Sequence, residues 1–517
     1  MTRPLYQFNG GIHPEENKNI STQHPIVTAP IPTQLIVPVH QHIGQAAKPC
    51  VSEGEYVLKG QIIAHAEGYI STAIHAPSSG IVSKVGMHAL PHPSGLSDIC
   101  IYIDTDGKDE WCERQPIDYR NLNASALRNR LRDMGIAGLG GAVFPSFIKL
   151  NPGVPQKVKT LLLNGGECEP WISCDDMTMR ERATEILAGA EIMRFMLRAE
   201  TVLIGIEDNK PVAITAMQNA AALCKFPVEV IVIPTRYPSG GAKQMIKVIT
   251  GKEVPSGGRS TDIGVATFNV GTAYAIHRAV HHGEPLISRI ITITGNVQQA
   301  RNVEALIGTP MDVLLQIAGG HPHAVSGYVM GGPMMGIDLQ DIDVPVVKAT
   351  NCILVKSDKL FPPPLPAMPC IRCGRCADAC PADLQPQELY WFSRAKNFDK
   401  AQKYQLFDCI ECGCCSYVCP SHIPLVQYYR YAKSEISAQQ LEYKAADHAR
   451  NRHETRLARI DREKQERAEK LAQKAASKPA AVLADDASAA AKKATIQAAI
   501  DRVKTNQATT QPPTEQS

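Results

Sequence analysis

The chain has 517 residues, 44% of them hydrophobic, and a formal net charge of +3 at pH 7, which favours a globular protein of about three domains. So small a charge excludes a strongly basic nucleic-acid-binding domain. The first residues lack the apolar core of a signal peptide, and no apolar run approaches the roughly 18 residues that span a bilayer, so we expect a soluble protein that meets any membrane through partners.

Residues 1–115 form the first predicted domain. Short apolar runs between residues 35 and 85 are separated by Gly, Pro and Ser, which is typical of small β-structure. The order V-x-E-G-x-x-V-x-x-G-Q-x-I-A from Val51 to Ala64 resembles the barrel-sandwich fold of lipoyl and biotinyl carrier domains. Those carriers present a modifiable lysine on a central hairpin, which here reads HAEGYIST without a lysine. We therefore predict a structural module.

Residues 116–284 form a predicted α/β domain. Leu127 and Leu131 have helical spacing, with Asn123 or Ser125 as the N-cap and Gly135 as the stop. Strands are predicted at residues 159–164, 201–206 and 228–234, and helices at 177–199 and 212–224. This alternation predicts a parallel sheet with crossover helices. Ligands of such sheets bind beyond the carboxyl ends of the strands.

Two polar segments of this domain are candidates for ligand binding. GIAGLGGAVFPSFIKL, residues 135–150, does not have the G-x-G-x-x-G spacing after a strand, so an ordinary dinucleotide-binding Rossmann site is not supported. Its glycines allow backbone N–H groups to approach a phosphate or a flat ring, and Lys149 adds charge; taken alone, a structural turn fits as well. LLLNGGECEP follows a predicted strand, and its Glu167 and Glu169 either bind ribityl or ribose hydroxyls or cap the next helix.

The remaining residues change texture three times. Residues 285–345 are β-rich and form the third predicted module. The proline-stiffened linker FPPPLP precedes the cysteine segment, residues 366–432. Residues 433–517 are rich in Arg, Lys, Glu and Ala, which predicts an exposed charged helix followed, from Pro479, by a disordered tail.

Half of the 16 cysteines occupy the pattern positions of two runs of the form C-x2-C-x2-C-x3-C-P, and Cys414 lies inside the second run as an extra cysteine. In that pattern three cysteines bind one [4Fe–4S] cluster and the fourth binds the other cluster. Zinc sites favour separated CxxC pairs, and disulfides do not need a repeated register. We therefore predict two clusters in a reducing compartment, the cytosol, and read Cys414 as a bystander. One predicted ligand set is Cys370, Cys373, Cys376 and Cys419, and the other is Cys380, Cys409, Cys412 and Cys415.

The α/β segments resemble the FMN- and NADH-binding subunit of respiratory complex I, whose loop reads G-x-G-G-A-G-F-P-T-x-x-K and is followed, after a strand, by N-x-x-E-x-E-P. Two later stretches, YPSGGAKQ and FNVGTAYAI, also match flavin-contacting segments of that family. The cofactor-binding positions that this resemblance implies are Gly138, Gly140, Gly141, Phe144, Lys149, Asn164, Glu167, Glu169, Gly240, Gly241, Asn269 and Thr272.

The order of modules over about residues 5–432 is similar to that of the C subunits of Rnf electron-transport complexes. The resemblance implies a multidomain α/β and β fold: an N-terminal barrel-sandwich module, an α/β FMN-binding domain, a β-grasp module, an α-helical two-[4Fe–4S] ferredoxin-like domain, and a charged helical and disordered tail. It also implies a peripheral subunit without a transmembrane segment, at the cytoplasmic face of the bacterial inner membrane.

The activity implied is NADH oxidation by FMN, followed by single-electron transfer through the two clusters to integral membrane and iron–sulfur partner subunits, and indirectly to ferredoxin, while the complex moves Na⁺ or H⁺. Lys149 and the loop amides are expected to hold phosphate, and Phe144 to stack on the dinucleotide. Asn164, Glu167, Asn269 and Thr272 are expected to fix the flavin. Hydride transfer needs proximity more than a proton shuttle, so no acid–base catalyst is expected.

Three departures from the complex I pattern keep alternatives open. Leu139 replaces an arginine, Val143 a glycine, and Gly166 an aspartate. Each removes a polar contact or crowds a close approach, so an electron-transfer adaptor that lost nicotinamide binding is one alternative. A flavin and iron–sulfur cobalamin reductase of a microcompartment is the other, although the charged tail and the absence of an encapsulation-like N-terminal helix disfavour it.

Overall fold

The computed structural model describes residues 3–151, 153, 157–476 and 486–507. The chain divides into two compact units, Met1–Glu435 and Ile436–Ser517. The first unit contains the β-structure and the cysteine runs, and the second is helical. None of the described helices combines the length and the apolar character that crossing a bilayer requires.

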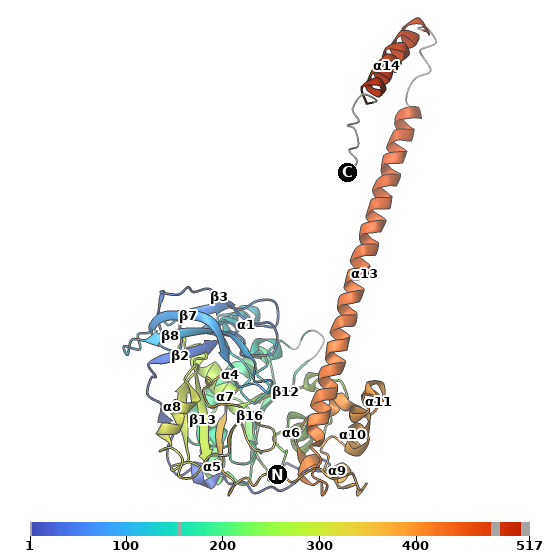
Figure 1. The fold of residues 1–517 in the computed structure, drawn as a ribbon. Helices are drawn as coiled ribbons and strands as arrows, with labels where there is room; N and C mark the ends of the chain where they lie inside the picture. The colour runs from blue at the N-terminus through green and yellow to red at the C-terminus, as the bar shows by residue number, and fades with distance from the viewer. Residues whose placement is uncertain (1–2, 152, 154–156, 477–485, 508–517) are drawn as a thin grey trace, which may run out of the picture. The chain divides into compact units, whose positions relative to one another are not determined.

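The N-terminal module consists of two small sheets, drawn in blue in Figure 1. Its interior is apolar, with Leu35, Val37, Ile101 and Ile103 fully buried, because β2 and β8 pair antiparallel and share one inner face. The strands of the two sheets are β2 (Gln34–Pro38), β8 (Ser97–Thr105), β7 (Gly80–Ala89) and β4 (Tyr56–Val57) in one, and β3 (Lys48–Pro49), β5 (Ile62–His65) and β6 (Ile74–His75) in the other.

The α/β module has a parallel sheet with the strand order β11-β10-β9-β12. Its strands read as continuous apolar runs because helices cover parallel sheets on both faces. The strands are β9 (Thr160–Gly165), β10 (Thr201–Glu207), β11 (Val228–Ile233) and β12 (Val265–Asn269). The helices are α1 (Ala124–Asp133), α2 (Ser146–Lys149), α3 (Cys174–Glu181), α4 (Ala183–Leu197), α5 (Pro211–Ala222), α6 (Ala242–Thr250) and α7 (Val270–His281).

Two details of these helices bear on the sequence predictions. Asn123, and not Ser125, caps α1, because its Oδ1 accepts from Ala126 N at 2.8 Å. The single helix predicted over residues 177–199 is wrong, since the chain leaves the helical conformation at Arg182 (φ −130°, ψ 28°). This break allows α3 to contact α5 while α4 packs along α7.

The third module is built on a mixed six-stranded sheet with the order β1-β14-β13-β17-β15-β16. Its apolar core includes Ile291, Val303, Met311 and Ile353. Two strands of this sheet, β1 and β17, lie outside residues 285–345 in the sequence. The predicted residue boundaries between the modules stay predictions. The elements are β1 (Val27–Thr28), β13 (Ser288–Gly295), β14 (Arg301–Leu306), α8 (Met311–Ile317), β15 (Gly327–Met330), β16 (Ile337–Leu339) and β17 (Cys352–Lys356).

The two cysteine runs fold alike. In each, a glycine with positive φ lies between the second and third cysteines and precedes a one-turn helix that contains the third: Gly374 (φ +81°) before α9, and Gly413 (φ +83°) before α12. A residue with a side chain is disfavoured in this conformation, which explains glycine at both places. The helices of the segment are α9 (Arg375–Asp378), α10 (Pro386–Arg394), α11 (Phe398–Lys403), α12 (Cys414–Tyr417) and the start of α13 (Leu425–Ala476).

The C-terminal part contains most of α13 and a second helix, α14 (Asp486–Gln507), labelled in Figure 1. Leu457 and Leu471 are exposed, as expected of a helix supported by charges rather than by core packing. The predicted disorder is wrong for residues 486–507, because their alanine-rich composition has a high intrinsic helix propensity. The predicted disorder at residues 479–485 and 508–517 lies outside the described residues.

Candidate functional site

The eight cysteines at the pattern positions of the two runs line two separate cavities. Each cavity takes three cysteines from one run and the fourth from the other. The cavity that we call proximal is lined by Cys380, Cys409, Cys412 and Cys415, and the distal cavity by Cys370, Cys373, Cys376 and Cys419. These are the two groups expected of a pair of four-cysteine clusters, and the ligand role of each cysteine stays a prediction.

The chemistry of the proximal cavity fits an iron–sulfur cluster. Apolar side chains, among them Leu389 and Val426, complete its wall. Backbone N–H groups point at two of the sulfurs: Leu384 N lies 3.4 Å from Cys380 Sγ and Glu411 N lies 3.4 Å from Cys409 Sγ. Burial raises the pKa of the Cys409 thiol to about 11, so a metal must displace its proton to obtain the thiolate. Sulfurs that converge within an apolar wall and accept N–H bonds are the surroundings that tune such clusters.

Cys414 is fully buried beside Cys412 but lines neither of these two cavities. It packs instead with Ile12, Tyr237 and Ala379 in a small apolar cluster. The structure therefore gives it a place in the packing, next to a predicted ligand.

The proximal cavity adjoins the α/β module. The Tyr237 hydroxyl donates to the carbonyl of Cys412 at 2.6 Å, and Gln244 Nε2 donates to the carbonyl of Pro381 at 3.1 Å. Lys243 and Asp408 form an ion pair at 3.1 Å. Cys373, in the distal cavity, is exposed. The cysteine segment therefore presents one cavity to the α/β module and has an exposed predicted ligand at the other.

Replacing Tyr237 with phenylalanine should lower the melting temperature by a few degrees. The carbonyl of Cys412 loses its buried donor, which costs about 1–3 kcal/mol. Thermal unfolding of the reconstituted protein measures this change. Tyr56→Phe is the matched control, because that hydroxyl donates to Asp106 at an exposed place. Equal melting temperatures for the Tyr237→Phe variant and the parent would contradict the assigned contact.

The glycine loop lies against the N-terminus of α7. Gly138 N donates to the carbonyl of Phe144 at 2.8 Å, which closes the loop. Leu139 N donates to Thr272 Oγ1 at 2.9 Å. A Cβ on Gly140 would stand 3.1 Å from the Cβ of Asn269, so glycine permits this close approach. Gly140 and Gly141 are exposed, which leaves their backbone accessible to a ligand.

Lys149 stands at the inner side of this loop. Its ammonium group donates to the carbonyl of Thr267 and lies 4.4 Å from the centre of the Phe268 ring. Among the described residues, no carboxylate forms an ion pair with it. Burial lowers the pKa of Lys149 to about 8. A partly buried cation without an acidic partner fits an anionic ligand such as a phosphate.

At the end of β9, Asn164 packs closely against the glycines of the YPSGG segment. Asn164 Nδ2 donates to the carbonyl of Gly240 at 2.7 Å, and its Oδ1 accepts from Gly166 N at 3.0 Å. A Cβ on Gly166 would lie 2.9 Å from the Cα of Gly240, so the aspartate of complex I does not fit this backbone arrangement. Gly241 is the N-cap residue of α6.

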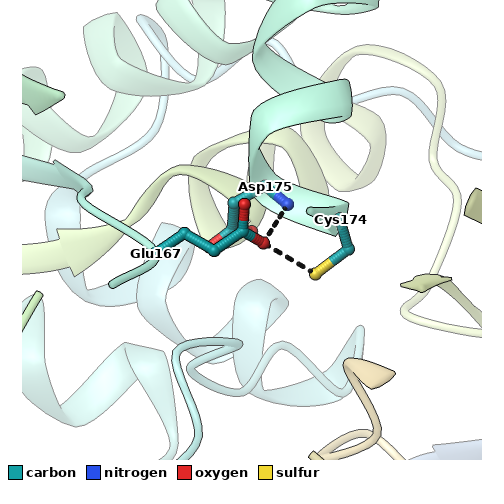
Figure 2. A group of neighbouring side chains, drawn as sticks. All are labelled: Glu167, Cys174 and Asp175. Carbon is teal, nitrogen blue, oxygen red and sulfur yellow. Dashed lines mark hydrogen bonds between the residues drawn. The ribbon is translucent and has the colours of Figure 1, made fainter. Parts of the chain in front are cut away.

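Glu167 caps helix α3, which is one of the two roles that the sequence left open (Figure 2). Its carboxylate accepts from Asp175 N at 2.7 Å and from Asp176 N at 3.0 Å, and the Cys174 thiol donates to it at 3.3 Å. Burial, with Glu167 nearby, raises the pKa of Asp175 to about 7. Asp175 in turn accepts a hydrogen bond from the side chain of Asn269. The cap thus connects to the N-terminus of α7.

Glu169 faces the β-rich module. Its carboxylate accepts from Met334 N at 2.6 Å and from Met335 N at 2.9 Å. Lys18 holds the same stretch of backbone, because its ammonium donates to the carbonyls of Glu167, Glu169 and Ile172 at 2.6–2.7 Å. Glu169 therefore binds the backbone of the β-rich module, whereas Asn269 and Thr272 bind Asp175 and Leu139. The role of Glu169 in binding flavin stays a prediction.

Three residues that position this site were not predicted. Asp175 lies in the first turn of α3, where an acidic residue often interacts with the helix end, but the predicted helix began only at residue 177. Lys18 ends the segment FNGGIHPEENK, residues 8–18, and no pattern in that segment predicts its contacts. Arg289, on β13, is buried and donates to the carbonyls of Leu139 and Thr350. Its contact with the glycine loop joins residues 150 positions apart, and no local pattern predicts it.

Four family models match the chain. They are the Nuo51 FMN-binding domain over residues 131–278, the RnfC barrel sandwich hybrid domain over 6–108, the SLBB domain over 290–338, and the 4Fe-4S dicluster domain over 369–423. These matches confirm the predicted fold class and the FMN and iron–sulfur cofactors. The site described above thus contains an FMN-binding domain in direct contact with a dicluster domain.

Curated relatives match nearly the whole chain, and each is named as the C subunit of an ion-translocating oxidoreductase complex. The protein of Serratia proteamaculans is 49% identical over 98% of this chain and 70% of its own length. The relative from Erwinia tasmaniensis is 49% identical over 98% and 61%, and that of Yersinia pestis is 48% identical over 96% and 79%. The chain therefore spans about 61–79% of the length of these relatives.

Among solved structures, one from an NAD⁺-reducing [NiFe]-hydrogenase has a TM-score of 0.44 and 16% identity, and covers 63% of each chain. The curated relatives, at 47–49% identity, decide the family. The chain belongs to the family of C subunits of ion-translocating oxidoreductase complexes, the Rnf complexes.

Proposed function

We propose that this electron-transfer subunit oxidises NADH and passes the electrons one at a time to partner subunits of a membrane-bound complex. That complex couples electron transfer between NADH and ferredoxin to the movement of Na⁺ or H⁺. The partners are its integral membrane and iron–sulfur subunits, and the chain works at the cytoplasmic face of the bacterial inner membrane. Membership of the Rnf family disfavours the alternative of a microcompartment cobalamin reductase.

One observation carries the proposal: the FMN-binding domain touches the proximal cavity directly. Tyr237 belongs to the YPSGG segment, in which the carbonyl of Gly240 accepts from Asn164, and its hydroxyl donates to the carbonyl of Cys412. Bound FMN accepts two electrons as hydride and releases them singly, and bound [4Fe–4S] clusters accept single electrons. The contact puts the two kinds of chemistry side by side in one chain.

The residues of the glycine loop are proposed to hold the flavin and the dinucleotide. Lys149 pairs with a phosphate, and the accessible amides of Gly140 and Gly141 approach the same ligand. Thr272 fixes this loop against α7 through Leu139, and Asn269 holds the N-terminus of α7 against α3 through Asp175. Phe144, half-buried in the loop, stacks on the dinucleotide.

The order of the two cavities follows from the same contacts. A cluster held in the proximal cavity would be the first acceptor of electrons from a flavin, because this cavity adjoins the FMN-binding domain at Cys412. The distal cavity, where Cys373 is exposed, then faces the partner. Spacing alone gave no order, because the two cysteine runs have the same pattern.

Anaerobic reconstitution of the whole chain with iron, sulfide and FMN, followed by titration with NADH, tests the proposal. NADH should bleach the flavin absorbance, and reduced-cluster signals should then appear in the EPR spectrum. Flavin that stays oxidised under excess NADH, but is reduced by dithionite, would reject NADH oxidation.

That second result would favour the adaptor, in which the chain bridges other redox proteins without binding nicotinamide. A specific observation keeps this candidate in view: Leu139, at the place of the complex I arginine, buries its side chain. Val143 is also buried, in the left-handed conformation with φ +45°. The loop therefore offers fewer polar side chains to a dinucleotide than its complex I counterpart does.

A further inference from the structure

The barrel-sandwich module presents three apolar side chains to solvent beside the glycine loop, two of them on the hairpin and the third, Ile43, between β2 and β3. Tyr69 is 67% exposed, Ile70 37% and Ile43 53%. Ile70 and the segment after Ile43 pair through the bond from Gln45 N to the carbonyl of Ile70, at 2.9 Å. We call these three residues the hairpin patch; Tyr69 and Ile70 lie on the hairpin where carrier domains present their modifiable lysine.

The hairpin patch meets the glycine loop on both sides of Phe144. Ile43 N donates to the carbonyl of Val143 at 3.3 Å. The ring of Tyr69 stands edge-on to the ring of Phe147, with the ring centres 6.4 Å apart. The patch therefore contacts the same loop in which Gly140 and Gly141 are exposed.

The hairpin is held in place from the α/β module. Arg132, on α1, donates to the carbonyls of Gly68 and Ser71, which flank the tip of the hairpin. Its guanidinium group also lies 5.7 Å from the centre of the Phe147 ring. The backbone on both sides of Tyr69 is therefore fixed, and the Tyr69 ring itself contacts Phe147.

We propose that Tyr69 is a specificity-determining residue whose ring stacks on the adenine of NADH, an inference that rests on the proposed function. The nicotinamide ring must reach the flavin, so the adenosine half extends away from it over the exposed part of the loop. An exposed and fixed aromatic ring next to that loop suits a planar base. Stacking on an aromatic side chain favours any base without requiring hydrogen bonds.

The test compares ligands with and without adenine on the reconstituted full-length protein. Tyr69→Ala should weaken the binding of ADP-ribose, measured by calorimetry, about tenfold, and should raise KM for NADH by a similar factor with kcat unchanged. Reduced nicotinamide mononucleotide lacks adenine, so its KM should not change. Tyr69→Phe should retain the affinity of the parent, since stacking needs the ring alone. Ile81→Ala, which removes an exposed apolar side chain of the same module, is the control.

The outcomes separate this inference from the proposed function. If the parent binds ADP-ribose and the Tyr69→Ala variant binds it equally well, the stacking role is refuted while NADH oxidation stands. A parent that binds no ADP-ribose and is not reduced by NADH overturns both. A rise in KM for both NADH and the mononucleotide also refutes stacking on adenine, because it shows a general disturbance of the loop.

Discussion

Replacing Cys415 with serine should reduce the iron content of the reconstituted protein from about eight atoms to about four. Cys415 lines the proximal cavity with three other cysteines, and an alcohol there cannot supply the fourth thiolate. NADH should still bleach the flavin in this variant, but the distal cluster should stay oxidised, because the cavity next to the FMN-binding domain no longer holds a cluster. Iron analysis and EPR during the NADH titration measure both effects.

Cys414→Ser is the matched control, since it makes the same chemical change one position earlier. Cys414 is buried but lines neither cavity, so iron should remain at about eight atoms. Cys373→Ser, in the distal cavity, should also lose about four atoms of iron but leave the proximal cluster reducible. If the Cys373 variant blocked reduction and the Cys415 variant did not, the proposed order would be reversed.

The grouping of the cysteines followed from the sequence because cluster spacing is a local property. Six of the eight positions are fixed by two short turns, each with a glycine in the left-handed conformation. The order of the cavities was not predictable, since it depends on the contact between Tyr237 and Cys412, residues 175 positions apart. Local spacing carries no information about which copy of a repeat meets a distant module.

In the FMN-binding region too, local features could be predicted from the sequence and long-range contacts could not. The close approach of Gly140 to Asn269 explains the glycine, and Glu167 takes the capping role that the sequence had left open. Arg289 escaped prediction because it reaches the loop from another module. The polar, low-complexity composition of the tail predicted disorder, but the high helix propensity of alanine favours the helix α14 instead. The predictions for Arg289 and α14 therefore failed because a long-range contact decided the first and a competing propensity decided the second.

Replacing Lys149 with alanine should weaken FMN binding by roughly 10- to 100-fold, the range expected for losing a hydrogen bond to a charged group. The loss follows because Lys149 is a partly buried cation beside the loop that has no ion-pair partner among the described carboxylates. Fluorescence titration of FMN into the FMN-depleted protein measures the affinity. The iron content should not change, because Lys149 lines neither cysteine cavity.

The pH dependence of that affinity is the sharper test. Burial lowers the pKa of Lys149 from 10.5 to about 8, so the ammonium is charged below pH 8 and loses its proton above it. FMN affinity should therefore fall as the pH rises through 8, by up to about tenfold for each further unit. Arginine stays charged at these pH values, so Lys149→Arg should bind FMN with little change between pH 7 and 9. A fall of the same size in the Lys149→Ala variant would show that another group titrates and that Lys149 does not hold the phosphate.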